Sequence, residues 1–218
     1  MAVRPVFVVQ ASKPFVKTEM MEFVYHPGFA LSQSRKNIES LHDHFVSKYR
    51  EYDGLLLEIS TKSNLPLGVC LSAFNLTYSL RDGRTCSVEN VFQSSKCFSN
   101  GRQYQEILDL SASEAKHFPA LRTSGDVIAF QLEGIEYPTE PKTFFYHWLY
   151  VNALNQHQDL ANEVIKYRAF TDIVFNPAKS INCQARSAAL FVGLHESGLL
   201  DEAVSSPDRF SELVFDCY

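Results

Sequence analysis

The segment Ser87–Lys96 carries three side chains that could act together on a glycosidic bond. Its apolar periodicity predicts a helix, on which Glu89, Gln93 and Lys96 stand at positions i, i+4 and i+7 and share one face. A carboxylate can move protons at a reacting carbon, and an amine in an apolar setting has a lowered pKa and can attack as a nucleophile. The alternative is the ordinary solvated face of a surface helix.

The run Leu71-Ser-Ala-Phe-Asn-Leu76 is a second candidate segment, and Ser72, Phe74 and Asn75 are its candidate substrate-binding residues. An aromatic ring beside an amide can stack on a base or a ribose and bind a polar edge. The alternative is an inner strand with Phe74 in the core and Asn75 bonding a turn.

The polar loop Asn176–Arg186 leads into a predicted helix and is the third candidate. Free backbone N–H groups at a helix start, with Ser180, Asn182 and Arg186 nearby, suit a phosphate or a pyrophosphate. The alternative is a capped helix with Arg186 in a surface ion pair. The segment Ser32–Asn37 follows the same logic.

Short β-branched or aromatic runs that end at turn residues predict the strands that would position these segments. Such runs are Val3–Val9, Glu22–Tyr25, Leu55–Ile59 and Ile173–Phe175. Two hairpins are predicted by tight-turn dipeptides between strand-like runs. Leu76–Leu80 and Arg84–Cys86 flank Asp82–Gly83, and Val127–Leu132 and Ile135–Tyr137 flank Glu133–Gly134.

Helical spacing of apolar residues and terminal signals predict the helices. They are Ser32–Tyr49, Ser87–Phe98, one or two short helices before Phe118, Thr139–Asn155 with Pro141 in its first turn, Asp159–Arg168 and Gln184–Glu196. Trp148 is expected in the core. Because strands cluster early and helices late, we predict an α+β fold, a single helix-rich domain with a small, mostly antiparallel sheet.

Charge and composition exclude several function classes. The chain has 218 residues, 45% of them hydrophobic, and a net charge of −5, whereas a protein that holds long nucleic acid is usually basic. Any nucleic-acid contact is therefore expected to be local. The apolar runs are too short to span a bilayer, and Met1–Gln10 resembles an edge strand more than a signal peptide, so we expect a cytoplasmic protein without membrane contact.

Five cysteines without CxxC spacing and seven scattered histidines indicate neither a disulfide framework nor a zinc site. No GxGxxG turn, Walker loop, GxSxG elbow or HExxH helix is present. We therefore expect no metal and no cofactor.

The three segments, in this order, resemble the NADAR domain family. Its members show a Leu-Ser-Asn-Phe-like segment followed by a Val-Glu-His-x-x-Gln-x-x-Lys-like helix, which Ser87-Val-Glu-Asn-Val-Phe-Gln-Ser-Ser-Lys96 matches at Glu89, Gln93 and Lys96. Asn90 stands at the histidine position, and Asn75 aligns only loosely. The segments 32–38 and 175–186 resemble the branch found beside DarT-type toxins. The likeness covers about residues 21–200, with Ser180–Arg186 in place of the Trp-Gly-like signature of other branches.

The resemblance implies one NADAR-like domain over residues 1–218, with an N-terminal extension of residues 1–60 packed on a family core of about residues 65–200. It also implies an antitoxin enzyme of a toxin–antitoxin system in phage defence. The DarT-type toxin would attach ADP-ribose from NAD to guanine in single-stranded DNA, and this protein would remove it. The toxin would be a functional partner, with physical binding left open.

The resemblance further implies a mechanism in which Glu89 and Lys96 are catalytic. The pyrophosphate of ADP-ribose, the product, would lie near the Asn182–Arg186 helix start and its distal ribose against Glu89 and Lys96. Glu89 would protonate the departing guanine amine or help to open the ribose ring. Lys96 would attack the C1 carbon to form a Schiff base or stabilise developing charge, and water would release ADP-ribose.

Two alternatives stay open from the sequence. One is an N-glycosidase that acts on small phosphorylated metabolites, such as the ribosylated pyrimidines handled by other members of this family. The other is a module without catalysis that binds ADP-ribose or the toxin, and the net charge of −5 would suit an antitoxin that holds a basic toxin.

Overall fold

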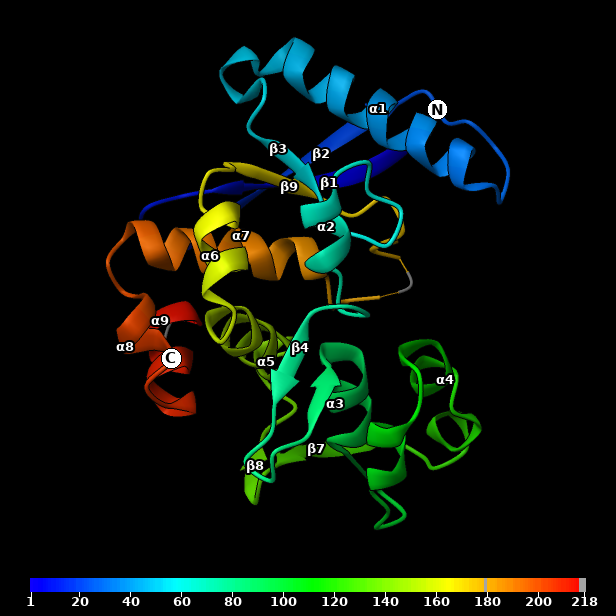
Figure 1. Ribbon diagram of the computed structural model, residues 1–218, viewed down its shortest axis with the longest axis vertical. Coiled ribbons are helices and arrows are strands. Elements are labelled where there is room, and N and C mark those ends of the chain that lie inside the picture. Colours follow the sequence, from blue (N-terminus) through cyan, green and yellow to red (C-terminus); the bar gives the residue numbers. More distant parts are fainter. Residues whose placement is uncertain (179, 216–218) are drawn as a thin grey trace.

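The computed structural model describes residues 1–178 and 180–215, and its upper layer is a four-stranded sheet between two helices (Figure 1). The strand order is β2-β1-β9-β3, formed by Val16–Phe23, Ala2–Val9, Ala169–Thr171 and Leu56–Glu58. β1 pairs antiparallel with β2 and β9, whereas β3 and β9 are parallel. Helix α1, Leu31–Lys48, covers one face, and α7, Gln184–Glu196, covers the other.

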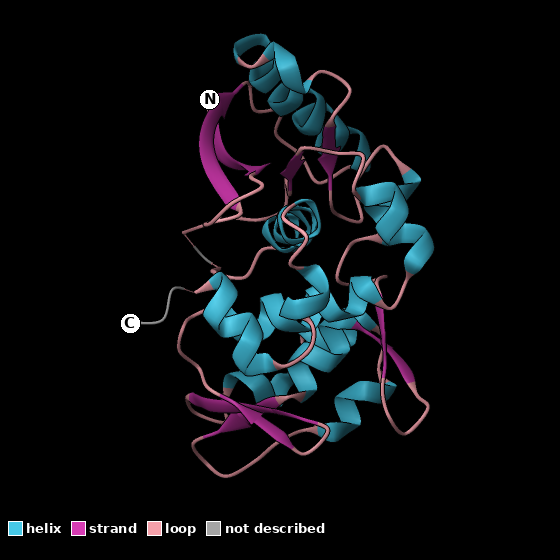
Figure 2. Ribbon diagram, turned by 90° about the vertical axis from the view of Figure 1, so that its left-hand side faces the viewer, coloured by secondary structure: helices cyan, strands magenta, loops and turns pink. Residues whose placement is uncertain are grey.

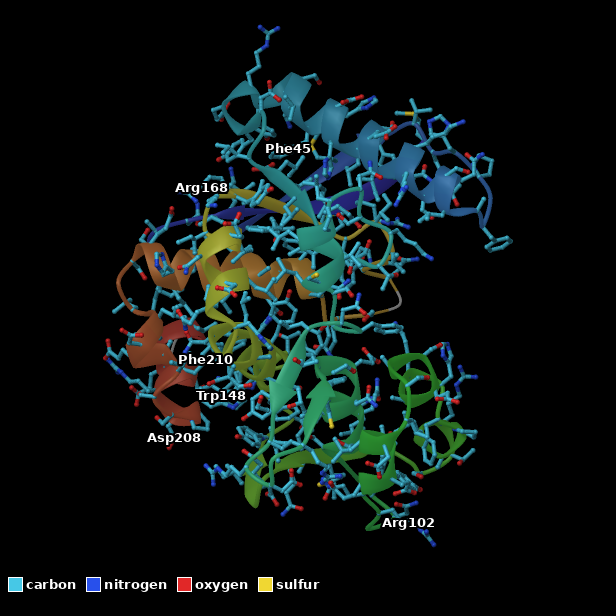
Figure 3. The ribbon with its side chains drawn as sticks, viewed as in Figure 1. Phe45, Arg102, Trp148, Arg168, Asp208 and Phe210 are labelled. Carbon is cyan, nitrogen blue, oxygen red and sulfur yellow. The ribbon has the colours of Figure 1, made fainter. Side chains whose placement is uncertain are left out.

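Alternation along β1 explains why the sheet is covered on both faces. Val6 and Val8 point towards α1 and pack in a cluster with Leu41 and Phe45, whereas Phe7 belongs to the cluster on the α7 side. Phe45 lies between α1 and the sheet in Figure 3. The segment 1–60, expected to be an extension packed on the core, thus supplies three of the four strands, and β9 of the C-terminal half joins them in one sheet.

Two expected strands are shifted. β2 spans Val16–Phe23 rather than Glu22–Tyr25. It is an edge strand with charged residues at exposed positions, and these residues hide the alternation of apolar and polar residues that would predict a strand. The strand near Ile173–Phe175 is instead β9 at Ala169–Thr171, all of it buried. The chain turns immediately afterwards because the Asp172 carboxylate accepts hydrogen bonds from the backbone N–H groups of Val174 and Phe175.

The lower half holds the two predicted hairpins, which are confirmed (Figure 2). β4, Thr77–Ser79, pairs with β5, Thr85–Ser87, and β7, Val127–Leu132, pairs with β8, Ile135–Tyr137. Gly83 and Gly134 adopt φ values of +90° and +81°, which the turns require. β6, Lys96–Phe98, adds an antiparallel strand to β7, so that the strands of the described residues form three separate sheets.

Most predicted helices are present with adjusted ends. α1 and α7 agree with the sequence, α3 is only Val88–Ser94, α5 spans Phe144–Asn155 and α6 spans Gln158–Val164. The expected start of α5 at Thr139 was wrong, because Thr143 at its N-cap has a left-handed φ of 74°. The short helices before Phe118 are a 3-10 turn at Gln105–Asp109 and α4, Ala112–Lys116. The sequence did not predict α2, α8 and α9, at Pro66–Cys70, Leu200–Ala203 and Pro207–Val214.

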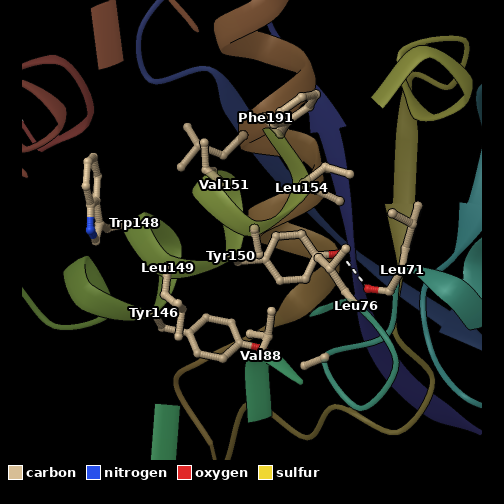
Figure 4. Close-up of a cluster of buried hydrophobic side chains, with 14 of the residues drawn as sticks. Leu71, Leu76, Val88, Tyr146, Trp148, Leu149, Tyr150, Val151, Leu154 and Phe191 are labelled. Carbon is tan, nitrogen blue, oxygen red and sulfur yellow. Dashed lines mark hydrogen bonds between the residues drawn. The ribbon is translucent and has the colours of Figure 1, made fainter. Parts of the chain in front are cut away.

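Helix α5 runs through the centre of the core. Tyr150 is fully buried on it and donates a 2.6 Å hydrogen bond from its hydroxyl to the carbonyl oxygen of Leu71, which ties α5 to the end of α2 (Figure 4). Trp148 is buried, as expected, and its ring lies 5.6 Å from that of Phe210 on α9 (Figure 3). The observed architecture is an α+β fold, as predicted. No helix among the described residues combines the length and apolar character needed to span a bilayer.

Candidate active site

A cavity of about 620 Å³ is lined by residues that follow two strands of the upper sheet and by residues of α3 and β7. Its wall combines the ends of β3 and β9, the segment after α2, the inner face of α3 and the loop before α7. The lining residues are Ser60, Thr61, Lys62, Ser72, Ala73, Phe74, Glu89, Phe92, Gln93, Lys96, Lys116, Phe130, Tyr146, Asp172, Val174, Phe175, Asn176, Ser180, Asn182 and Gln184. Seven of the nine candidate site residues from the sequence are among them.

The start of α3 is attached to the segment after α2 by its backbone. Ser87 ends β5 and caps α3 by accepting a hydrogen bond from the N–H of Asn90. The N–H of Val88 donates to Leu76 and that of Glu89 to Ala73, at 2.8 and 2.9 Å. Because both bonds join main-chain atoms, the contact between the first turn of α3 and the 72–76 segment does not depend on the identity of the side chains.

Asn90, which stands at the family's histidine position, does not line the cavity. Its side chain is buried, and its amide donates to the carbonyl oxygens of Ile107 and Leu110 at 2.8 and 2.6 Å. These bonds attach the outer side of α3 to the 3-10 turn that precedes α4. The role of Asn90 here is to fix the position of the helix.

Glu89 and Gln93 form a bonded pair on the cavity side of α3. Both side chains are buried, and Gln93 Nε2 donates a 2.8 Å hydrogen bond to Glu89 Oε1. Because Oε1 of Glu89 accepts this bond, the amide oxygen of Gln93 points away from it, and the other carboxyl oxygen of Glu89 stays available for a proton. The predicted shared face of these two residues is confirmed.

Lys96 lies in the cavity but not on the helix, so the expectation that α3 extends to Phe98 was wrong. The hydroxyls of Ser94 and Ser95 both donate to the carbonyl oxygen of Val91, and such back-bonding competes with helix continuation. The chain then turns into β6, where Lys96 is paired in register with Phe130 of β7. The pairing of β6 with β7 therefore brings the amine of Lys96 to the cavity, whereas the sequence predicted that helix α3 would do so.

The surroundings of Lys96 lower the pKa of its amine. Its Nζ lies 5.0 Å from the centroid of the Phe92 ring. Desolvation by burial lowers the pKa of Lys96 below the usual 10.5, and the charge of Glu89 opposes this shift in part. A neutral amine next to a carboxylate is the pair that nucleophilic attack on a carbon with proton transfer requires.

The three candidates after α2 separate in the structure. Ser72 is buried and lines the cavity, and Phe74 is half-buried at its wall with Lys116 Nζ 5.2 Å from its ring centroid. Asn75 is exposed, does not line the cavity and donates from its amide to Val69 O at 2.8 Å. Asn75 thus bonds a turn, whereas Phe74 has a face towards the cavity.

The candidates before α7 separate in the same way. Ser180 and Asn182 line the cavity. Arg186 does not, because one helical turn further on its half-buried side chain points to the edge strand, where it donates to Thr18 Oγ1 at 3.2 Å. The expectation that Arg186 lies beside the helix start as a phosphate ligand is therefore not met by its position.

The sequence did not point to Gln184 and Asp172, which join three walls of the cavity. Gln184 Oε1 accepts from the N–H of Ala73 at 2.7 Å, while its Nε2 donates to Ile59 O at 2.8 Å and to Asp172 Oδ2 at 3.0 Å. An acidic residue directly after the buried run Ala169–Thr171 was the available signal for Asp172. For Gln184 the sequence held no signal, since its three partners are remote in the chain.

Asp172 shares its buried surroundings with Glu58, whose carboxylate accepts from Ser60, Thr171 and the N–H of Ile173 at 2.7, 2.6 and 2.9 Å. Burial raises the pKa of Glu58 and, together with the charge of Glu58, raises the pKa of Asp172 to about 7. A carboxyl group with such a pKa can donate or accept a proton near neutrality.

The cavity is less acidic than the protein around it. Among the described residues, its charged lining groups are three lysines, Lys62, Lys96 and Lys116, and two carboxylic acids, Glu89 and Asp172. Burial shifts both Lys96 and Asp172 towards their neutral forms, so Lys62 and Lys116 are the cations that the cavity offers to an anionic ligand, although the whole chain has a net charge of −5.

Unpartnered polar atoms gather around this cavity. Within the described residues, four buried side-chain nitrogen or oxygen atoms lack a hydrogen-bond partner: Ser72 Oγ, Gln93 Oε1, Asn182 Oδ1 and His147 Nε2. The first three belong to lining residues. An unpartnered buried polar atom costs about 1–3 kcal/mol, so these three atoms at one cavity are sites where water or a ligand can bind.

Residues 1–178 and 180–215 contain no cluster of three or more histidine, cysteine, aspartate or glutamate side chains that could hold a metal ion. The sequence profile of the family described as DarT1-associated NADAR antitoxin matches residues 2–218. A search of curated proteins found no match to the chain.

Proposed function

Since the chain belongs to the family of DarT1-associated NADAR antitoxins, we propose that it removes ADP-ribose from guanine bases of single-stranded DNA. The reaction is hydrolysis of the N-glycosidic bond between the distal ribose and the guanine amine. The observation that most supports a ligand of this kind is the convergence of Ser72 Oγ, Gln93 Oε1 and Asn182 Oδ1 on one cavity. The hydroxyl and amine groups of a nucleotide sugar and a base are suitable partners for such atoms.

The charged and aromatic lining residues suit the remaining parts of ADP-ribose. Lys62 and Lys116 are available for the diphosphate, and the rings of Phe74 and Phe175 for stacking on a ribose or a base. A volume of about 620 Å³ lies within the range of nucleotide-sized ligand sites.

The proposed chemistry uses Glu89 and Lys96 in sequence. Glu89, as an acid, protonates the ribose ring oxygen while the C1–O bond breaks, which leaves C1 joined to the guanine amine as an iminium ion. The neutral amine of Lys96 attacks C1, a proton moves to the guanine nitrogen, and the C1–N bond to guanine breaks with its electron pair on that nitrogen. C1 is then held by Lys96 as an imine, and the lowered pKa of Lys96 favours the attack.

Water completes the reaction. It adds to C1 of the protonated imine and loses a proton, and the C1–N bond to Lys96 breaks with its electron pair on the lysine nitrogen. The ribose hydroxyl formed in the first step adds back to the C1 aldehyde and closes the ring, and a proton returns to Glu89, so that ADP-ribose and the free lysine result with net consumption of one water molecule. Asp172 lines the same cavity, and its pKa of about 7 suits it to accept the proton of that water at neutral pH.

The test is incubation of the protein with an oligonucleotide that carries ADP-ribosylated guanine, with free ADP-ribose as the readout. We expect turnover by the wild type and a loss of at least about a hundredfold in Glu89→Gln and Lys96→Ala. The matched controls are Glu163→Gln and Lys166→Ala, since these two residues form an exposed ion pair on and just after α6. Borohydride should trap a Lys96 adduct, and full turnover by Lys96→Ala would exclude the covalent route.

Two further assays separate this function from the alternatives. Activity on a small amine-linked ribose phosphate, with none on the modified oligonucleotide, would assign the cavity to metabolite hydrolysis. Neutralisation of the toxin by a double variant, Glu89→Gln with Lys96→Ala, would assign the protein to binding without catalysis.

A further inference from the structure

A second hollow, of about 310 Å³, adjoins the cavity and shares four lining residues with it: Phe92, Phe130, Tyr146 and Asn182. The rest of its wall is mainly the segment 138–145, which leads into α5, together with Ile181. The two spaces are therefore neighbours, and the side chains of Phe92, Phe130, Tyr146 and Asn182 border both.

A row of aromatic rings runs from the cavity into this hollow. Lys96 Nζ lies 5.0 Å from the ring centroid of Phe92, that ring lies 5.5 Å from Phe130, and Phe130 is stacked on Phe145 at 4.7 Å with an interplanar angle of 19°. Phe145 lines only the hollow, whereas Phe92 and Phe130 line both spaces. Phe92 and Phe145 are 7% and 2% exposed, so the half-buried ring of Phe130 is the part of this row that a flat aromatic group can contact by stacking or at its edge.

Asn182 stands at the junction of the two spaces. Its Oδ1 is buried and has no hydrogen-bond partner within the described part of the chain. An asparagine amide presents an acceptor beside a donor, and the edge of a purine presents the complementary pair. An aromatic wall with an unpartnered amide at its border is therefore the arrangement that a purine base would satisfy.

We propose that this hollow is a subsite for a purine base of the substrate, which lies against the half-buried ring of Phe130 beside Phe92 and bonds to the amide of Asn182. This inference rests on the proposed function, because it takes the cavity to hold the ADP-ribose part. The purine is either the guanine that leaves or the adenine of ADP-ribose. The structure favours guanine, because the hollow begins one ring away from Lys96 and the leaving base is bonded directly to the carbon that Lys96 attacks. Lys142, exposed at the rim, is positioned for a phosphate of the attached strand.

The test compares two substitutions in the full chain, Asn182→Leu and Ile181→Asp. Asn182→Leu removes the amide, and Ile181→Asp places a carboxylate at a lining position that is 57% exposed, where folding tolerates it. Calorimetry measures the Kd of ADP-ribose and of deoxyguanosine monophosphate, and kinetics measures KM for the modified oligonucleotide. Thermal melting of each variant confirms that it is folded.

If guanine occupies the hollow, both variants raise KM and the Kd of deoxyguanosine monophosphate by about tenfold or more, and Ile181→Asp, which does not line the cavity, leaves the Kd of ADP-ribose within about twofold. If adenine occupies it, the Kd of ADP-ribose rises by the same factor, and replacement of its adenine by hypoxanthine weakens binding to the wild type only. If the Kd of both ligands were unchanged in both variants, the proposed subsite would be wrong. Hydrolysis of the oligonucleotide by the wild type would in that case still support the proposed function. If the wild type had no hydrolytic activity, the proposed function would fail, and the two Kd series would still decide the subsite.

Discussion

The amide of Gln93 donates from Nε2 to Oε1 of Glu89, one helical turn earlier, over 2.8 Å. This bond uses the donor that faces Glu89 and leaves the amide oxygen of Gln93 buried and unpartnered at the cavity. The pair therefore presents a carboxylate and an amide oxygen in a fixed relation, which neither side chain would hold alone.

Substitution of Gln93 by leucine should lower kcat by about ten- to a hundredfold with little loss of stability. The side chain keeps a similar size, but Glu89 loses the bond that orients it, and small misplacements of a catalytic group are costly. Steady-state kinetics on the modified oligonucleotide measures the effect. Gln158→Leu, on the exposed face of α6, is the control, and wild-type kcat in Gln93→Leu would show that Glu89 needs no orienting partner.

The rate of imine formation should depend on pH through Lys96. Because burial lowers the pKa of Lys96 below 10.5, the neutral amine forms at lower pH than for an ordinary lysine, so the rate should rise with pH and level off before 10.5. Single-turnover trapping with cyanoborohydride measures this curve. Glu89→Gln should move it to still lower pH, because the charge of Glu89 raises the pKa of Lys96. Asp172, with a pKa of about 7, also titrates in this cavity, so the comparison is repeated in Asp172→Asn.

A curve that levels off only above pH 10.5 would contradict the desolvated amine. Lys96→Arg is the matched control, because it keeps a positive charge on β6 but cannot form an imine.

The stability of the wild type relative to Asp172→Asn should fall as pH rises. Burial and the charge of Glu58 raise the pKa of Asp172 from 3.8 to about 7, so the folded state binds the proton more tightly than the unfolded state. The free energy of unfolding therefore decreases between about pH 4 and 7, by roughly 4 kcal/mol at most. The asparagine variant has no titrating group at this position and should not show this decrease. Urea unfolding from pH 4 to 8 measures the difference, with exposed Asp159→Asn as control; parallel profiles would contradict it.

Replacement of Gly193 by alanine should destabilise the fold by about 1–3 kcal/mol, although alanine is the better helix former. A Cβ atom at this position of α7 would lie 2.7 Å from Phe15 O and 2.9 Å from Gln10 O, which are main-chain atoms of the β1–β2 connection. Chemical denaturation measures the loss. His195→Ala, exposed on the same helix, should have almost no effect, and a stabilised Gly193→Ala would show that propensity outweighs the contact.

Local patterns in the sequence determined the parts of the fold that depend on neighbours in the chain. Asp82–Gly83 and Glu133–Gly134 each form a hairpin turn because turn conformation depends on the residues within it. The spacing of Glu89 and Gln93 placed both on one face of α3 because helical geometry repeats every 3.6 residues. The order of the candidate segments likewise pointed to the family that the profile match supports.

Only the tertiary structure decided which polar groups meet in the cavity. Gln184 bonds to Ala73, 111 residues away, and Thr171 bonds to Glu58, 113 residues away, and no periodicity relates such positions. Arg186 and Asn75 had suitable chemistry but point elsewhere, and Lys96 reached the cavity by strand pairing with β7 instead of helix continuation. The physical reason is that buried polar atoms must find hydrogen-bond partners, and the packing of elements that are remote in the chain decides which partners are near. A local sequence pattern contains no information about which remote elements pack together.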